Sequence, residues 1–173
     1  MTPVVRAEQT AGDFEALVRE HQSMVFSLAY HFLHDRALAE EVAQEVFLSL
    51  HRNLATVESA AHALFWLRQA TVRRAIDEMR RRRRRPQVAL EEVPEPATGA
   101  GTPDPLLGEV LRRLIAALPE APRMVMVLRY QEELEPSEIA ELLEMPLATV
   151  KSHLHRSLAL LREKLGRRGL GER

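Results

Sequence analysis

Through the first half of the chain, apolar residues recur every three to four positions, in three blocks separated by short polar breaks. This spacing puts the apolar side chains on one face of a helix, so each block predicts an amphipathic helix with a buried stripe. Asp13, Asp35 and Ser59 stand at the starts of the blocks and belong to the residue types that cap helix N-termini. Three helices with short connections predict a compact bundle. The expected inward positions are Phe14, Leu17, Val18, Met24, Val25, Leu28 and Phe32, then Leu38, Val42, Val46, Phe47, Leu50 and Leu54, then Leu64, Phe65, Leu67, Val72, Ile76 and Met79.

The helical spacing stops after residue 85. Five of the ten prolines and three of the seven glycines lie between Pro86 and Gly108. Proline removes a backbone donor and glycine loosens the backbone, so this composition predicts a flexible linker. The expected organisation is a first domain over residues 1–85, a linker over 86–105 and a second domain over 106–173.

The second half regains the helical spacing in two segments, one ending at Pro119 and the next running from about residue 121 to 130. Two more helices with a tight turn between them follow. Glu135 and Glu138 have the spacing of a capping box, and Pro136 suits the first turn of a helix. Pro146 pushes the preceding residue out of helical geometry and so ends this short helix. With no strand pattern anywhere, the fold class is all-α.

The last helix has two different faces. A stripe of Val150, Leu154, Leu158 and Leu161 forms the apolar side, and the opposite side carries Lys151, Ser152, His155 and Arg156. A helix-turn-helix inserts the N-terminal end of its second helix into the DNA major groove, which suits this polar, basic side. The alternative is ordinary helix packing with a solvated basic face.

Charge is segregated along the chain although the net charge is only −1. Nine arginines and two acids lie between Arg68 and Arg85, whereas the stretch from Pro86 to Glu109 has five acids and no Lys or Arg. This distribution predicts a basic binding face beside an acidic connector.

Several classes of protein are disfavoured. The chain has no cysteine, so disulfides and thiolate metal sites are absent, and no apolar run approaches the ~20 residues of a membrane span. His31, His34 and Glu41 are the best metal candidates, but no His-x-x-x-His or Glu-x-x-His pattern supports a site. There is no nucleophile–base set and no Gly-rich phosphate loop. We expect a cytosolic, non-catalytic protein without a metal or cofactor.

Three strings carry a family resemblance: AEEVAQEVF at residues 39–47, FWLRQATVRRAIDEMRR at 65–81 and PLATVKSHLHR at 146–156. In this order they resemble regions 2.2, 2.3–2.4 and 4 of bacterial sigma factors of the extracytoplasmic-function group, and the resemblance covers nearly the whole chain. It implies a protein that binds core RNA polymerase and directs promoter-specific transcription initiation, with an N-terminal three-helix bundle and a C-terminal four-helix domain. A stand-alone helix-turn-helix regulator is the alternative, although no dimerisation helix is evident. An anti-sigma-sequestered adaptor without promoter activity is a third reading.

The resemblance also assigns residues. The residues implied to dock on the clamp coiled coil of the polymerase are Glu41, Gln44 and Glu45. Those implied to contact the minus-10 element are Trp66, Arg68, Arg73, Arg74, Arg80 and Arg81. Those implied to face minus-35 bases are Lys151, Ser152, His155 and Arg156, with phosphate contacts from Thr149 and His153. Further implied partners are the β flap and an anti-sigma factor, and the free protein is expected to be a monomer.

The chain departs from the family pattern at four positions. Glu133 and Glu144 stand where the family usually has glycine, and a non-glycine residue with positive φ costs roughly 1 kcal/mol, so strain or an altered turn is expected at Glu144. Arg68 replaces the usual Tyr, and Arg73 replaces the usual Asn. These two replacements leave the minus-10 sequence open.

Overall fold

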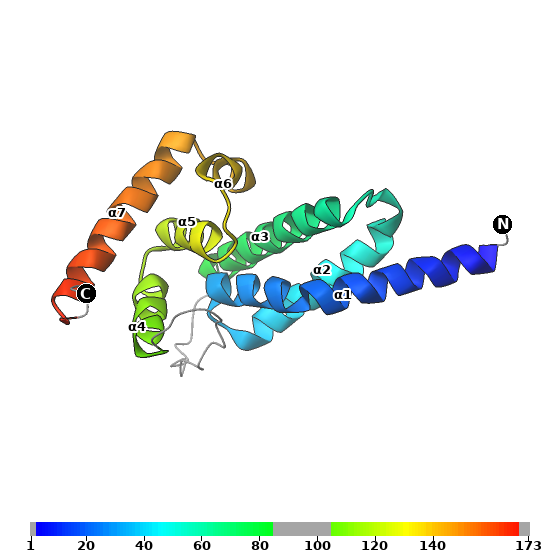
Figure 1. Ribbon diagram of the computed structural model, residues 1–173, viewed down its shortest axis with the longest axis horizontal. Helices are drawn as coiled ribbons and strands as arrows, with labels where there is room; N and C mark the ends of the chain where they lie inside the picture. Colours follow the sequence, from blue (N-terminus) through cyan, green and yellow to red (C-terminus); the bar gives the residue numbers. More distant parts are fainter. Residues whose placement is uncertain (1–2, 85–104, 170–173) are drawn as a thin grey trace. The chain divides into compact units, whose positions relative to one another are not determined.

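The computed structural model describes residues 3–84 and 105–169, and within these ranges the backbone forms helices and no strands (Figure 1). The prediction of an all-α fold is therefore confirmed. The chain divides into two compact units, Met1–Val88 and Ala89–Arg173. The segment expected to be a linker lies outside the described residues, apart from its last residue, Pro105, which begins a helix.

The N-terminal unit is a bundle of three helices, α1 (Pro3–Leu33), α2 (Arg36–Asn53) and α3 (Ala60–Arg84), with a short 3₁₀ helix, η1 (Leu54–Thr56), before α3. Each helix packs against both of the others (Figure 1). Full burial of an aliphatic or aromatic side chain stabilises a fold by about 1.5–3 kcal/mol, so the shared core holds the three helices together. The large side chains that are fully buried in it are Val25, Leu28, Phe32, Val46, Leu50, Leu67 and Val72.

The expectations for Asp13 and Phe65 are wrong. The first helix begins at Pro3, so Asp13 lies within α1 and does not cap it. Phe65 was expected in the core, but its side chain is 55% exposed. The buried residues of α3 include Ala63 and Leu67, and Phe65 is two positions from each. Phe65 lies on the same side of α3 as Val72, which is seven positions later and fully buried, so helical rotation alone does not account for its exposure.

The junction between α1 and α2 joins all three helices. His34 has φ 49°, a left-handed conformation that ends α1, and Asp35 caps α2 by accepting a hydrogen bond of 3.0 Å from the Leu38 backbone N–H, as its position predicts. From α3, Arg82 donates to the Leu33 carbonyl oxygen at 3.2 Å and forms an ion pair with the Asp35 carboxylate. Arg82 is therefore a structural residue.

The C-terminal unit contains four helices in its described part, α4 (Pro105–Ala116), α5 (Glu120–Tyr130), α6 (Pro136–Leu142) and α7 (Leu147–Gly166). The α7 helix packs against α4, α5 and α6. It contributes Leu161 to a buried cluster that also contains Leu114, Leu118 and Met126. This packing fixes which side of α7 faces solvent.

The turn between α6 and α7 is closed by two backbone hydrogen bonds. Glu144 N–H donates to the Glu141 carbonyl at 3.3 Å, and Met145 N–H donates to the Ala140 carbonyl at 2.9 Å. This is a Schellman motif, which requires a left-handed residue at the position of Glu144, and Glu144 has φ 54°. Glu144 therefore has the positive φ at which strain is expected, and Glu133 also has a positive φ, 55°.

The start of α6 has the capping box that the sequence predicts. The Glu138 carboxylate accepts a hydrogen bond of 2.7 Å from the Glu135 backbone N–H. Arg129, near the end of α5, donates to the Leu134 carbonyl at 3.0 Å and pairs with the Glu135 carboxylate at 2.9 Å. These contacts connect α5 to α6 and set the direction in which the helix-turn-helix leaves the rest of the unit.

Replacing Glu144 with Gly is expected to raise the free energy of unfolding of the C-terminal unit by roughly 0.5–1 kcal/mol, because glycine adopts positive φ without strain but is freer when unfolded. Glu141→Gly is the matched control, since Glu141 is exposed and lies within α6. That change should lower the free energy by roughly 1 kcal/mol. Native-state hydrogen exchange of the α6 and α7 amides measures both, and a loss of stability in Glu144→Gly would contradict the strain.

Candidate nucleic-acid interface

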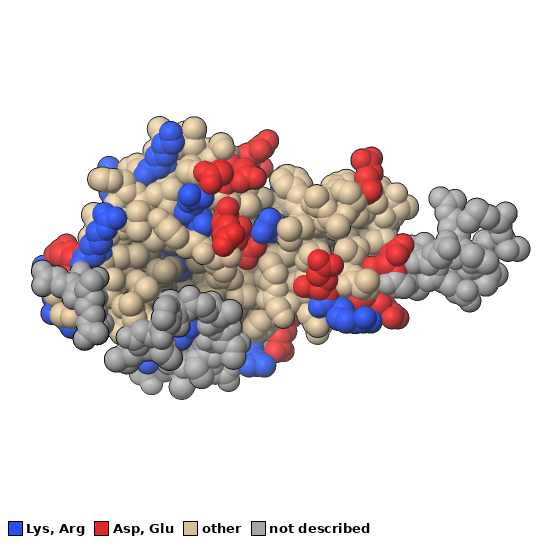
Figure 2. All heavy atoms as spheres, viewed as in Figure 1, with Lys and Arg blue, Asp and Glu red and all other residues tan. Residues whose placement is uncertain are grey.

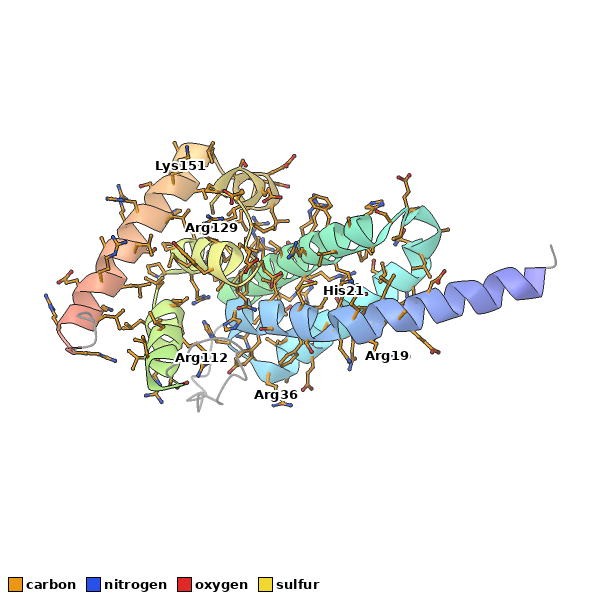
Figure 3. All side chains as sticks on the ribbon, viewed as in Figure 1. Arg19, His21, Arg36, Arg112, Arg129 and Lys151 are labelled. Atoms are coloured by element: carbon orange, nitrogen blue, oxygen red, sulfur yellow. The ribbon has the colours of Figure 1, made fainter. Side chains whose placement is uncertain are left out.

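The outer face of α7 presents polar side chains to solvent. Lys151, His155 and Arg156 are exposed and Ser152 is half-buried, while Val150 on the opposite side is fully buried. Figure 3 labels Lys151 near the N-terminal end of the helix, and Figure 2 shows basic side chains along the outer edge that α7 forms. The four side chains expected to face bases therefore share a solvent-exposed surface at the end of α7 that follows the turn.

Other residues border this surface. Thr149 and His153 are half-buried and lie between the exposed and buried sides of α7, where side chains can reach a DNA backbone beside a groove. Leu147, the first residue of the helix, is 41% exposed and was not among the residues predicted from the sequence. Leu147 precedes Val150, the first buried residue of the apolar stripe of α7, and this position could have identified it as an exposed apolar residue.

Within the C-terminal unit, positive charge away from α7 is partly neutralised. On α4, the Glu109 carboxylate accepts hydrogen bonds from Arg112 at 2.7 Å and from Arg113 at 2.8 Å. Both hydrogen bonds lower the pKa of Glu109, and the one from Arg112 has the larger effect. Figure 3 labels Arg112 on this helix. On α5, burial lowers the pKa of Arg123, which nevertheless stays charged. The exposed basic residues Lys151 and Arg156 of α7 have no such acidic partner among the described ion pairs.

The α2 helix carries a second polar face. Glu41, Gln44 and Glu45 are all exposed, on the side opposite the buried Val42 and Val46. Beside this face, α1 and α2 border an open groove of about 750 Å³. Its lining is largely apolar and includes Phe14, Val18, Phe26, Phe47 and Leu48, and Gln44 also lines it.

The sequence did not predict this groove. Phe47 was expected to point inward, but it is half-buried and lines the groove, and Leu48 is 58% exposed. Leu48 lies two positions after Val46 and two before Leu50, both of which are fully buried. It therefore lies off the buried stripe, and together with the other apolar side chains that line the groove it forms a contiguous apolar surface, which is a feature of interaction sites.

The outward face of α3 combines an aromatic ring with cations. Trp66, Arg73 and Arg80 follow one another at seven-residue steps, which are nearly two helical turns and keep them on one side. Trp66 is half-buried, and Arg73 and Arg80 are exposed. The exposed Phe65 stands beside Trp66, so two aromatic rings lie near the start of the helix. Arg68 is half-buried and comes two positions after Trp66, about 200° around the helix, so it does not lie on the line of Trp66, Arg73 and Arg80.

The remaining arginines of α3 have different surroundings. Arg74 forms an ion pair of 2.5 Å with Glu45 of α2, and Arg82 is held at the junction of α1 and α2. Arg81 lies 3.0 Å from Glu78, and Arg80 lies 3.7 Å from Asp77. The run of arginines is thus not one uniform patch: the structure separates Arg74 from Arg73 and ties Arg82 to the fold.

Other kinds of site find no support in residues 13–84 and 107–169. No three His, Asp or Glu side chains gather there in a way that could hold a metal ion. None of the described helices is long and apolar enough to cross a membrane. An exposed basic helix-turn-helix and a separate bundle with an arginine-bearing face are the features of a DNA-binding transcription protein.

Comparison with known proteins narrows this class to one family. Residues 17–85 match the family described as Sigma-70 region 2, and residues 108–161 match Sigma-70, region 4. The chain is 31% identical over 161 residues to the RNA polymerase sigma-E factor of Streptomyces coelicolor, covering 93% of this chain and 90% of that protein. It is 29% identical over 177 residues to an ECF RNA polymerase sigma factor of Bacillus subtilis, covering 94% and 92%.

A longer relative and a solved structure are also similar to this chain. Against a probable RNA polymerase sigma factor of Xanthomonas campestris the identity is 30%, over 86% of this chain and 39% of that protein. The solved structure of CnrH in complex with the cytosolic domain of CnrY is similar in fold, with a TM-score of 0.59 and 19% identity over 95% of this chain and 96% of that chain. The protein belongs to the sigma-70 family of RNA polymerase sigma factors and is of the ECF type.

Membership of this family gives the function and the main partners. The chain is a sigma factor for promoter-specific transcription initiation, and its partners are RNA polymerase and promoter DNA. Sigma factors are initiation factors rather than enzymes. Since both sigma regions are present, in the order that the sequence predicts, the reading as a stand-alone helix-turn-helix regulator is set aside.

The different surroundings of Arg80 and Arg82 predict different effects of the same substitution. Arg82→Ala removes the partner of Asp35 and of the Leu33 carbonyl, so it should lower the free energy of unfolding of the N-terminal unit by roughly 1–2 kcal/mol. Arg80→Ala should change it by less than ~0.5 kcal/mol while flattening the salt dependence of DNA binding by up to ~0.9 log units. Trp66 fluorescence follows unfolding, and equal effects of the two variants would contradict the distinction.

Proposed function

We propose that the polar faces of three helices divide promoter recognition among them. The α2 face docks on the clamp coiled coil of core RNA polymerase, the α3 face binds and opens the minus-10 element, and α7 reads the minus-35 element while its unit rests on the β flap. The observation that carries this proposal is that each polar face stands opposite a buried apolar stripe of the same helix. Each face is therefore available for binding without any loss of core packing.

Docking through α2 is supported by the combination of polar and apolar surface there. Protein interfaces join an apolar centre to a polar rim. The groove beside α2, with Phe47 and Leu48, provides the apolar part, and Glu41, Gln44 and Glu45 provide hydrogen-bond acceptors at its side. All three side chains are exposed, so their replacement would leave the buried core intact, although Glu45 also pairs with Arg74 of α3.

For the minus-10 element, the support lies in the aromatic and basic composition of the α3 face. Unstacked bases bind aromatic rings at about 1–3 kcal/mol per base, and Phe65 and Trp66 offer two rings. Arg73 and Arg80 lie further along the same side and neutralise phosphates. Arg81 follows Arg80 directly, so a strand running along α3 would meet first rings and then cations, whereas Arg68 would contact DNA only from another side of the helix.

Base reading by α7 follows from side-chain chemistry. An arginine pairs bidentately with guanine O6 and N7, and a lysine can reach the same atoms. Arg156 and Lys151 are therefore the strongest candidates for specific contacts. Ser152 and His155 lie between them on the exposed face and form further hydrogen bonds to bases. Thr149 and His153, at the border of that face, are placed for phosphates.

An anti-sigma factor is a further proposed partner, and we infer a monomer for the free chain. The proposal of an anti-sigma partner is supported by the structural neighbour CnrH, which was solved in complex with the cytosolic domain of CnrY. The groove between α1 and α2 and the exposed Leu48 offer apolar surface for such a protein as well as for polymerase. A single surface that serves both would make the two partners compete.

Changing Gln44 and Glu45 together to Ala is expected to weaken binding of core RNA polymerase about tenfold or more, since central interface residues cost more than about 1 kcal/mol when truncated. Thermal stability should change by less than ~0.5 kcal/mol because both side chains are exposed. Glu15→Ala is the control, an exposed acid on α1 outside the proposed face. The dissociation constant of the labelled chain with purified core enzyme, and transcription from a cognate promoter, measure the effect.

Undiminished polymerase binding in the double variant would remove α2 from the docking site. Equal weakening by Glu15→Ala would instead indicate a general effect of acidic charge. Either result would leave membership of the sigma family intact, because that rests on the whole sequence.

Arg156→Ala should weaken binding to the cognate minus-35 element by roughly 1–3 kcal/mol and relax the preference at one base position. Arg162→Ala is the matched control, because Arg162 is exposed on the same helix but nearly two turns farther from the N-terminal end. It should reduce affinity for all sequences alike. Competition binding with a set of single-base minus-35 variants separates the two effects. Uniform weakening by Arg156→Ala would assign Arg156 to a phosphate instead.

A further inference from the structure

Two adjacent arginines of α3 have opposite surroundings. Arg73 is exposed on the side that also carries Trp66 and Arg80. Arg74 is turned about 100° further around the helix, toward α2. Its guanidinium lies 2.5 Å from a carboxylate oxygen of Glu45, although the two residues are 29 positions apart in the sequence. The Arg74 side chain is 37% exposed and that of Glu45 is 50% exposed.

We propose that Arg74 is a positioning residue for polymerase docking and does not belong to the DNA-binding face. Its guanidinium holds the Glu45 carboxylate in the orientation in which it meets the polymerase. This inference rests on the proposed docking of polymerase through Gln44 and Glu45, and it gives that site a member from a second helix.

The chemistry of the pair supports a positioning role. A free glutamate side chain samples many rotamers, and a partner that binds one of them must overcome the loss of this freedom. A charge-assisted hydrogen bond from Arg74 restricts Glu45 before polymerase arrives, so part of that cost is already met. One bond leaves most of the carboxylate's acceptor positions open to a donor on the polymerase.

The same pair disfavours Arg74 as a phosphate contact. The Glu45 carboxylate offsets the positive charge of Arg74 and would repel a phosphate brought within reach of it. Arg73 has no such acid among the described ion pairs and lies on the outward face. The two neighbours therefore serve different partners, which their sequence positions alone do not reveal.

The rival reading is a latch. If polymerase draws Glu45 away and frees Arg74 for the DNA, loss of Arg74 would weaken promoter binding by the complete holoenzyme. Polymerase affinity would then stay the same or improve, because docking would no longer break the ion pair. The two readings predict opposite changes in the same two measurements.

The test uses the full chain with core RNA polymerase and measures two quantities: the dissociation constant for core enzyme, and the salt dependence of promoter binding by the holoenzyme. Arg74→Ala is expected to weaken core binding about two- to fivefold, the range of partly exposed ion pairs, and to leave the salt slope unchanged. Arg74→Lys should restore most of the affinity. Arg73→Ala, the matched control, should leave core binding unchanged and flatten the salt slope by up to ~0.9 log units.

A double-mutant cycle with Glu45→Ala completes the test. In the Glu45→Ala background, Arg74→Ala should have no further effect on core binding, because it acts through Glu45. An equal effect of Arg74→Ala with and without Glu45, or a changed salt slope with intact core binding, would overturn the inference. If Glu45→Ala and Gln44→Ala leave core binding intact, the proposed docking site itself fails. If they weaken it and Arg74→Ala does not, only the role of Arg74 fails.

Discussion

Burial of one stripe of α3 against α1 and α2 is the constraint on which the N-terminal unit depends. Leu67, Thr71, Ala75 and Met79 enter the core, and this fixes the rotation of the helix about its axis. Every other α3 side chain then has a set direction. Aromatic rings and some arginines point outward, whereas others meet α2 or the end of α1. The binding surfaces proposed for polymerase and for DNA thus follow from the same core packing.

In the C-terminal unit, a strained turn between α6 and α7 determines where the proposed binding surface lies. The Schellman motif at the end of α6 needs a left-handed residue, and Glu144 fills that place at a cost of roughly 1 kcal/mol. Packing of Val150 and Leu161 in the core sustains the strain, because α7 would lose its buried side if the turn relaxed. The turn delivers the exposed end of α7 to solvent, where base contacts are proposed.

The positive surfaces of this protein depend on which arginines are paired with acids, and not on the net charge. A net charge of −1 would disfavour DNA binding if it were spread evenly. Instead, acids neutralise several arginines within the fold, as Glu109 does on α4 and Asp35 does at the start of α2. The cations left on the outer sides of α3 and α7 then act as local positive surfaces. Salt screens such surfaces, so promoter affinity is expected to depend on ionic strength.

The sequence by itself determined the helices apart from the start of α1, the capping box at Glu135, the unusual turn position at Glu144 and the family, because these depend on local spacing and on residue types in order. Tertiary structure decided the exposure of Phe65, the groove beside Leu48 and the separate partners of the arginines. Arg74 meets Glu45 across 29 residues, and Arg82 meets Asp35 across 47. Periodicity shows that one side of a helix is buried, but it does not show which neighbouring helix supplies a counter-ion. That depends on how the cores of three helices pack together.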